Sequence, residues 1–198
     1  MGRSNPGRRR LADQRAPASE SQTSPTGVGV VPAPSLAAAT VPRVWQGVGY
    51  RPLPDAALAR PLFDFAALTW PEAARVAFGW GAFAAARGMA PGERLVGALI
   101  AEAHERVMLL HGPVVLEGDE PLETAAQLVA AALDHAGALG AETLFARPQG
   151  LDRVWVRFGF IPVPESTLPT PLAGRVGAGL YAWRGGSALW TLRESPRG

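Results

Sequence analysis

Residues 111–160 contain strand and helix patterns that follow one another with only short connections between them. The segment reads HGPVVLEGDEPLETAAQLVAAALDHAGALGAETLFARPQGLDRVWVRFGF. It predicts an apolar strand, a turn, a long Ala-rich helix that Gly140 ends, a second strand, and a short helix that stops at Gly159. We therefore predict an α/β fold: a mixed, mostly antiparallel sheet flanked by helices.

The flanking sequence supplies the other expected elements. Residues 94–102 and 106–116 are predicted to be neighbouring strands joined by a short hairpin connection. A strand is expected near residue 44, and a helix over residues 69–87 that starts at Thr-Trp-Pro-Glu. Residues 179–193 are expected to form a final hairpin, because Gly-Gly lies between two alternating apolar runs.

The first 43 residues differ from the rest in composition. They are rich in Gly, Pro, Ser and Arg and show little hydrophobic periodicity, so we expect a disordered basic arm before a folded domain over residues 44–198. The domain carries 13 of the 19 positive charges and 15 of the 17 acids, so the basic character belongs to the arm. A contact between residues 1–43 and a polyanion such as nucleic acid is one expectation, and a targeting role is another.

Several kinds of chemistry are excluded by the residues that the sequence lacks. There is no cysteine, which removes disulfides, thiolate metal sites and a Cys nucleophile. All the positive side chains are arginines, so a Lys Schiff base is excluded. No His–carboxylate group has metal-ligand spacing, and no apolar run is long enough to cross a membrane. We expect a cytoplasmic protein without a metal.

The order of elements resembles that of the GNAT superfamily of N-acetyltransferases. AAALDHAGALGAETL is similar to the family's third helix and fifth strand, and DRVWVRFGF is similar to its fourth helix. The resemblance implies acetyl-CoA as a substrate, with the backbone of Val114 and Val115 receiving the pantetheine arm. It also implies that the diphosphate lies at a helix N-terminus, where residues 120–125 correspond to the family loop and Ala125 keeps its final small position.

The same alignment shows four departures from the family pattern, three of them in this loop. Glu120 replaces an Arg or Gln, Glu123 replaces a glycine, and Pro121 removes one N–H donor. The two acids instead favour the start of a helix, where they would act as caps. Trp155 replaces the tyrosine that serves as general acid, and an indole N–H cannot act as an acid near neutral pH.

Two other side chains are candidates for the catalytic base. Alternation along the strand places His111 on the same face as Val115, and Glu102 ends the preceding strand. By resemblance, residues 52–67 and 165–179 would shape the site of the amine acceptor. We expect a gap between the strands at residues 95–101 and 107–116 to decide whether a cofactor binds.

The sequence leaves three functions open. The first is a GNAT-like module with an altered or lost acetyl-CoA site that binds a ligand or protein partner. The second is an active, divergent N-acetyltransferase that moves acetyl from acetyl-CoA to an amine. The third is a nucleic-acid-associated protein that uses the basic arm. A homodimer is a further expectation, with Trp183 and Trp190 marking its interface.

Overall fold

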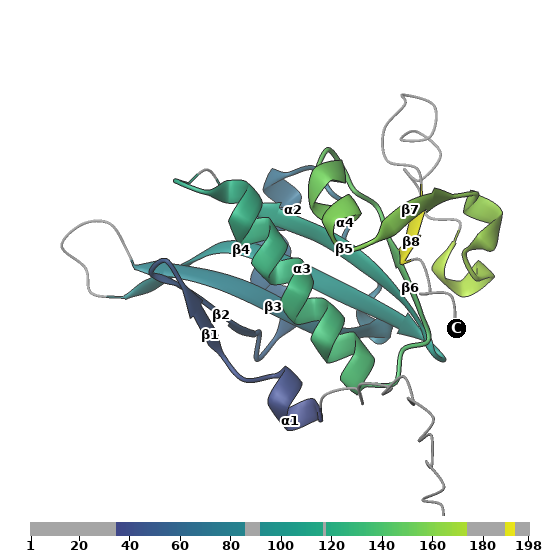
Figure 1. Ribbon diagram of the computed structural model, residues 1–198, viewed down its shortest axis with the longest axis horizontal. Helices are drawn as coiled ribbons and strands as arrows, with labels where there is room; N and C mark the ends of the chain where they lie inside the picture. Colours follow the sequence, from purple (N-terminus) through teal and green to yellow (C-terminus); the bar gives the residue numbers. More distant parts are fainter. Residues whose placement is uncertain (1–34, 86–91, 117, 174–188, 193–198) are drawn as a thin grey trace, which may run out of the picture. The chain divides into compact units, whose positions relative to one another are not determined.

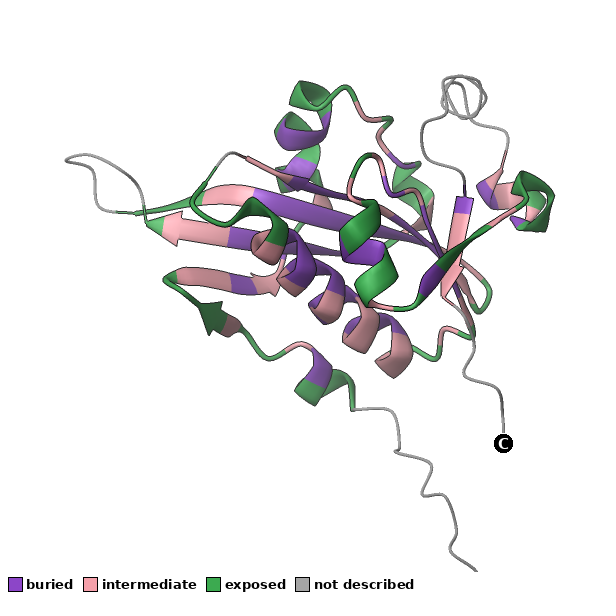
Figure 2. Cartoon of the chain, turned by 45° about the horizontal axis from the view of Figure 1, so that its top comes forward, coloured by how far each residue is buried: buried purple, intermediate pink, exposed green. Residues whose placement is uncertain are grey.

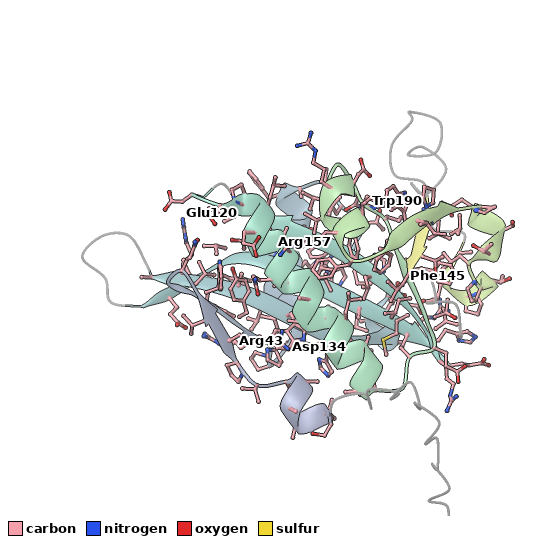
Figure 3. All side chains as sticks on the ribbon, viewed as in Figure 1. Arg43, Glu120, Asp134, Phe145, Arg157 and Trp190 are labelled. Atoms are coloured by element: carbon pink, nitrogen blue, oxygen red, sulfur yellow. The ribbon has the colours of Figure 1, made fainter. Side chains whose placement is uncertain are left out.

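The computed structural model describes residues 35–85, 92–116, 118–173 and 189–192. The expected arm therefore lies outside the described residues, except for its last few. These form helix α1 (Leu36–Ala39), which packs on the long helix α3, and the first residue of strand β1. Arg43 also pairs with Asp134 of α3 at 2.5 Å (Figure 3). The structured region therefore begins before residue 44.

The described strands form one sheet in the order β1-β2-β3-β4-β5-β6-β8-β7 (Figure 1). All of their pairings are antiparallel except that between β5 and β6, which is parallel. The mixed, mostly antiparallel sheet predicted from the sequence is thus confirmed. The strands are β1 (Arg43–Trp45), β2 (Val48–Pro52), β3 (Val76–Ala85), β4 (Glu93–His104), β5 (Val107–Val115), β6 (Thr143–Ala146), β7 (Phe160–Val163) and β8 (Leu189–Leu192).

Helices cover both faces of the sheet. Helix α3 (Pro121–Ala138) and the short helix α4 (Asp152–Arg157) pack on one face, and α3 crosses in front of the strands in Figure 1. Helix α2 (Arg60–Phe65), which follows the 3-10 turn η1 (Ala56–Ala59), packs on the opposite face. Three further 3-10 turns are η2 (Ala73–Arg75), η3 (Glu165–Thr167) and η4 (Thr170–Leu172).

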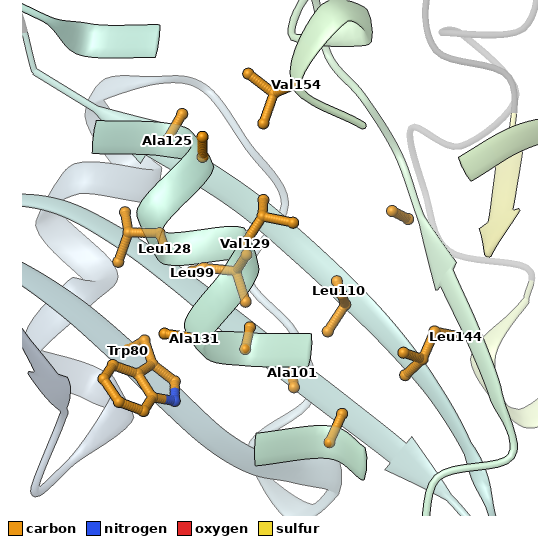
Figure 4. Packing of buried hydrophobic residues seen from close by; sticks show 14 of the residues in the cluster. Trp80, Leu99, Ala101, Leu110, Ala125, Leu128, Val129, Ala131, Leu144 and Val154 are labelled. Carbon is orange, nitrogen blue, oxygen red and sulfur yellow. The ribbon is translucent and has the colours of Figure 1, made fainter. Parts of the chain in front are cut away.

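Burial on α3 follows the helical period. The face toward the sheet is buried and the opposite face is partly or fully exposed (Figure 2). Small alanines on the buried face bring the helix close to the strands, where Leu128 and Val129 pack with Trp80 and Leu99 in the main core (Figure 4). This two-sided amphipathic pattern explains why the helix was predictable from sequence.

The expected helix over residues 69–87 is wrong. Residues 73–75 form the turn η2, and Val76–Ala85 is strand β3, which pairs with β2 and β4. Both faces of β3 are covered, so its sequence is apolar throughout and lacks the alternation of a half-exposed strand. Gly79 and Gly81 fit this strand because a Cβ there would come within 2.8 Å of Ile100 and 2.7 Å of Leu53.

The expected final hairpin is described only in its second half, since its first run lies outside the described residues. That half is β8, which pairs with β6 on one side and β7 on the other. Trp190, on β8, is partly buried against the main core. Trp183 is outside the described residues. Within the part of the chain that the structure covers, no helix is both long and apolar enough to cross a membrane.

Candidate active site

The sheet opens between β5 and β6. The two strands pair from Val107 with Thr143 to Leu110 with Ala146, where β6 ends while β5 continues to Val115. A cavity of about 360 Å³ lies beside this unpaired half of β5. We call it the opening, and its lining residues are Ala66, Leu68, Pro113, Val114, Val115, Pro121, Leu122, Gln149 and Leu151.

The opening is not where the sequence placed it. We expected a gap between residues 95–101 and 107–116, but these belong to β4 and β5, which pair from Gly97 with Val115 to His104 with Val107. The gap lies on the other edge of β5. Sequence adjacency suggested β4 as the partner across the gap, whereas β6 arrives there only after the α3 crossover.

Val115 presents backbone groups to the opening. The N–H of Leu116 donates to the carbonyl of Val96 on β4 at 2.8 Å. Because backbone groups alternate in direction along a strand, the N–H and C=O of Val115 point away from β4, toward the opening. Val114 has the opposite arrangement, and its side chain packs with Phe63 in the core on the α2 face. Pro113 offers only a carbonyl.

Glu102 and His111 form a pair on the sheet in which Glu102 is buried and His111 is partly buried. The Nε2 atom of His111 lies 2.7 Å from Oε2 of Glu102, whose side chain has no exposed surface, while the His111 side chain is 15% exposed. His111 is opposite Ile100 in the β4–β5 ladder, and Ile100 packs on the α2 face. Both members of the pair therefore lie on that face, beside the opening that begins at Pro113.

The expectation that His111 shares a face with Val115 is wrong. Val115 packs toward α3, whereas His111 faces α2 together with Val114. The β4–β5 register shifts between Ala98 and Ile100, and Gly112 adopts a positive φ of 92° at this place. The irregularity breaks the two-residue alternation, so simple counting across it gives the wrong face.

The face that carries the pair is covered by the segments we expected to shape the acceptor site. Phe63 of α2 lies 3.5 Å from the Cβ position at Gly112, next to His111. Turn η4 packs on β4, and Arg75 of η2 donates a hydrogen bond to the carbonyl of Pro171 within it. The pair thus lies on a surface walled by residues from 52–67 and from 165–173.

The N-terminus of α3 carries acidic side chains, and one of them, Glu123, is hydrogen-bonded to other side chains of the protein. Glu120 is the N-cap residue but makes no side-chain capping bond, so the expected hydrogen-bonded cap is absent, and Pro121 follows it (Figure 3). Glu123 instead accepts hydrogen bonds from Gln127 at 2.9 Å and from Arg157 of α4 at 2.9 Å. These bonds, Gln127 first, lower the pKa of Glu123 and keep it charged.

The remaining expected site residues are part of the core. Ala125 lies in the second turn of α3 and is fully buried against the sheet. Trp155 of α4 is also fully buried, and its ring meets that of Phe160 edge to face at 4.8 Å between centroids. Among the described residues, no group of three or more His, Cys, Asp and Glu side chains is arranged to hold a metal ion.

Sequence comparisons give no match, either with protein-family models or with curated proteins. Solved structures do match in fold. One is an N-acetylglutamate synthase from Neisseria gonorrhoeae complexed with coenzyme A and N-acetyl-glutamate, with a TM-score of 0.51 and 17% identity over 77% of this chain. The match spans only 36% of that synthase. Another is a GNAT-family acetyltransferase from Staphylococcus aureus Mu50, with a TM-score of 0.52 and 9% identity over 73% of this chain and 97% of that one.

At such low identity these matches bear on architecture rather than on chemistry. The chain has the fold of the GNAT N-acetyltransferases.

Proposed function

We propose that this chain is a divergent N-acyltransferase that moves an acyl group from a pantetheine thioester such as acetyl-CoA to an amine. The observation that carries the proposal is the Glu102–His111 pair, 2.7 Å apart, with Glu102 buried and His111 partly buried, beside an opening in the sheet. A binding module would need the opening but has no use for such a carboxylate–imidazole pair. A catalyst that must remove a proton from an amine has such a use.

The walls of the opening suit the arm of the donor. Its lining is mostly apolar, and Val115 offers an N–H and a C=O there, which match the alternating amide groups of pantetheine. An N-acetylglutamate synthase with this fold has coenzyme A bound. In the proposed reaction the amine nitrogen bonds to the thioester carbon, the C–S bond breaks, and sulfur leaves with the electron pair.

Glu102 and His111 would handle the proton in this reaction. A neutral His111 takes a proton from the attacking amine, and the carboxylate of Glu102 orients the ring and stabilises the imidazolium that forms. Because Glu102 is fully buried, its charge is screened little by water and acts strongly on the ring beside it. The walls formed by α2 and η4 would hold the amine against this pair.

The diphosphate end of the donor fits poorly at the N-terminus of α3. A diphosphate at the N-terminus of α3 would meet Glu120 and Glu123, and each like-charge contact costs on the order of 1 kcal/mol near a partly buried site. This observation favours a second candidate function, a module that binds a ligand or protein partner and has lost the use of acetyl-CoA. The two candidates differ in whether the opening binds a thioester arm.

A titration with acetyl-CoA that follows the melting temperature distinguishes the acyltransferase from the binding module, because a ligand that binds the native state must stabilise it. We expect a rise in melting temperature and acyl transfer to a panel of amines. His111→Ala should lower turnover roughly 10²- to 10⁴-fold and leave the shift in melting temperature unchanged. His104→Ala, at the last residue of β4, is the matched control. No stabilisation by millimolar acetyl-CoA would favour the binding module.

A further inference from the structure

The rim of the opening, which we define by Phe65 and Leu122, is apolar and exposed. Leu122, in the first turn of α3, lines the opening and is 52% exposed. Phe65, the last residue of α2, directly precedes the lining residue Ala66 and is 82% exposed. Large apolar side chains that gather beside a cavity, rather than standing singly on a surface, mark a place that another molecule covers.

Acidic side chains dominate the charge beside the rim. Asp119, Glu120 and Glu123 lie at the start of α3. Arg157 is already paired with Glu123 at 2.9 Å, and Arg94 lines another cavity, beside β2, together with the same acids. CoA brings a diphosphate and a further phosphate on its ribose, so several like-charge contacts would form here. The nucleotide of CoA is therefore a poor anchor for the arm that enters the opening.

Arg153 supplies positive charge on the α4 side of the opening. It lies in the first turn of α4, two residues after Leu151, which lines the opening. Arg153 is exposed and makes no ion pair with another described residue. A pantetheine arm that is attached to a serine carries its phosphate as a phosphodiester with one negative charge, and an arginine side chain can meet that charge with hydrogen bonds.

We infer that the preferred donor is a carrier protein that holds the thioester arm on a serine, an inference that rests on the proposed function. Apolar surface of the carrier covers Phe65 and Leu122, and Arg153 meets the phosphodiester. A few apolar and aromatic side chains of this kind supply most of the affinity of an interface. The amine nitrogen bonds to the thioester carbon, sulfur leaves with the electron pair, and the arm stays on the carrier as a thiol.

Donors that differ only in what holds the arm test the inference on the full-length protein. They are the acetylated holo-acyl carrier protein of a bacterial fatty-acid synthase, acetyl-CoA and acetyl-pantetheine, each assayed with the same amines. We expect the kcat/KM for the carrier protein to exceed both other values by about tenfold or more. A value for acetyl-CoA or acetyl-pantetheine that equals that of the carrier protein would overturn the inference. No turnover of any donor would instead refute the proposed function.

Variants at the rim give a second readout. Phe65→Ser should lower the kcat/KM for the carrier protein about tenfold more than that for acetyl-pantetheine. Leu139→Ser is the matched control, because Leu139 is 43% exposed at the opposite end of α3. Equal losses with both donors would overturn the inference, since Phe65 would then serve the amine or the fold. Arg153→Gln, which leaves the apolar rim intact, should show the same preference if Phe65→Ser does not fold.

Discussion

The two ends of the opening differ in character. The inner end has mostly apolar walls and lies beside the Glu102–His111 pair. The outer end, at the N-terminus of α3, has Glu120, Pro121 and a Glu123 side chain already paired with Arg157. Under the proposed function, the parts of the fold that would hold the arm and move the proton are separable from the part that would hold phosphate.

The largest effect is expected at the inner end. Glu102→Gln keeps a hydrogen-bonding group of similar size beside His111 but removes the charge that stabilises an imidazolium. Turnover should fall on the order of 10²-fold, with acetyl-CoA affinity changed less than about twofold. Steady-state kinetics and calorimetric titration measure the two quantities. A loss of affinity as large as the loss of turnover would show that Glu102 only supports the structure.

A substitution at Gly112 tests whether the backbone of β5 is constrained at the same end of the opening. Its φ of 92° and the crowding of its Cβ position, 2.9 Å from the Val114 nitrogen and 3.0 Å from the Ala98 oxygen, exclude a side chain. Gly112→Ala should lower the free energy of unfolding by about 1–3 kcal/mol, measured by urea denaturation. Gly137→Ala is the control, because no atom lies within 4 Å of its Cβ position and it lies within a helix. Similar losses in the free energy of unfolding for both variants would contradict the conclusion that the backbone of β5 is constrained at Gly112.

A smaller effect is expected at the outer end, with the opposite sign. Glu123→Gln removes a negative charge from the first turn of α3 and releases Arg157, so a diphosphate should bind better. Acetyl-CoA affinity should rise a few-fold, consistent with about 0.3–1 kcal/mol for a charge at a helix terminus. Glu142→Gln, whose ion pair with Arg106 lies beside the β4–β5 turn, should change nothing. Weaker binding by Glu123→Gln would show that the acid helps to hold the donor.

The smallest effect concerns pH and lies away from both ends. His135, near the end of α3, accepts a hydrogen bond from Trp80 and stacks on Phe78 at 4.1 Å. Burial lowers the pKa of His135, so the unfolded chain binds a proton more readily than the folded one. Stability is therefore full above the ordinary histidine pKa of about 6.5 and falls as the pH drops below it.

A variant isolates this contribution from the acyl-transfer chemistry. His135→Gln cannot titrate, so its melting temperature should decline less than that of the wild type between pH 7 and pH 5. Thermal denaturation at both pH values measures the difference. Parallel declines would assign the pH dependence to other groups, and any pH profile of turnover should be corrected for this loss of folded protein.

The sequence predicted best what local rules determine. Helix α3, the strand and short helix after it, and the β4–β5 hairpin follow from periodicity and from glycine stops. Strand β3 was missed because a strand buried on both faces has no alternation to read. The structure brings the candidate residues Glu102 and His111 into contact through the regular part of the β4–β5 register, where Glu102 is opposite Leu109 and His111 is opposite Ile100. The irregularity begins beyond this pair and changes only the face of the residues that follow His111.

Contacts between segments that are distant in the sequence could not be predicted from local sequence patterns. The opening involves β5 and β6, which are separated by the whole of α3, and the Arg157–Glu123 pair joins two helices.

The most direct test compares the affinities of this protein for acetyl-CoA and for acetyl-pantetheine, which has the arm and the thioester but lacks the nucleotide and its diphosphate. If the inner end holds the donor and the acidic outer end contributes little, the two dissociation constants should agree within about tenfold, roughly 1.4 kcal/mol. More than 100-fold tighter binding of acetyl-CoA, or no binding of either compound, would contradict the account.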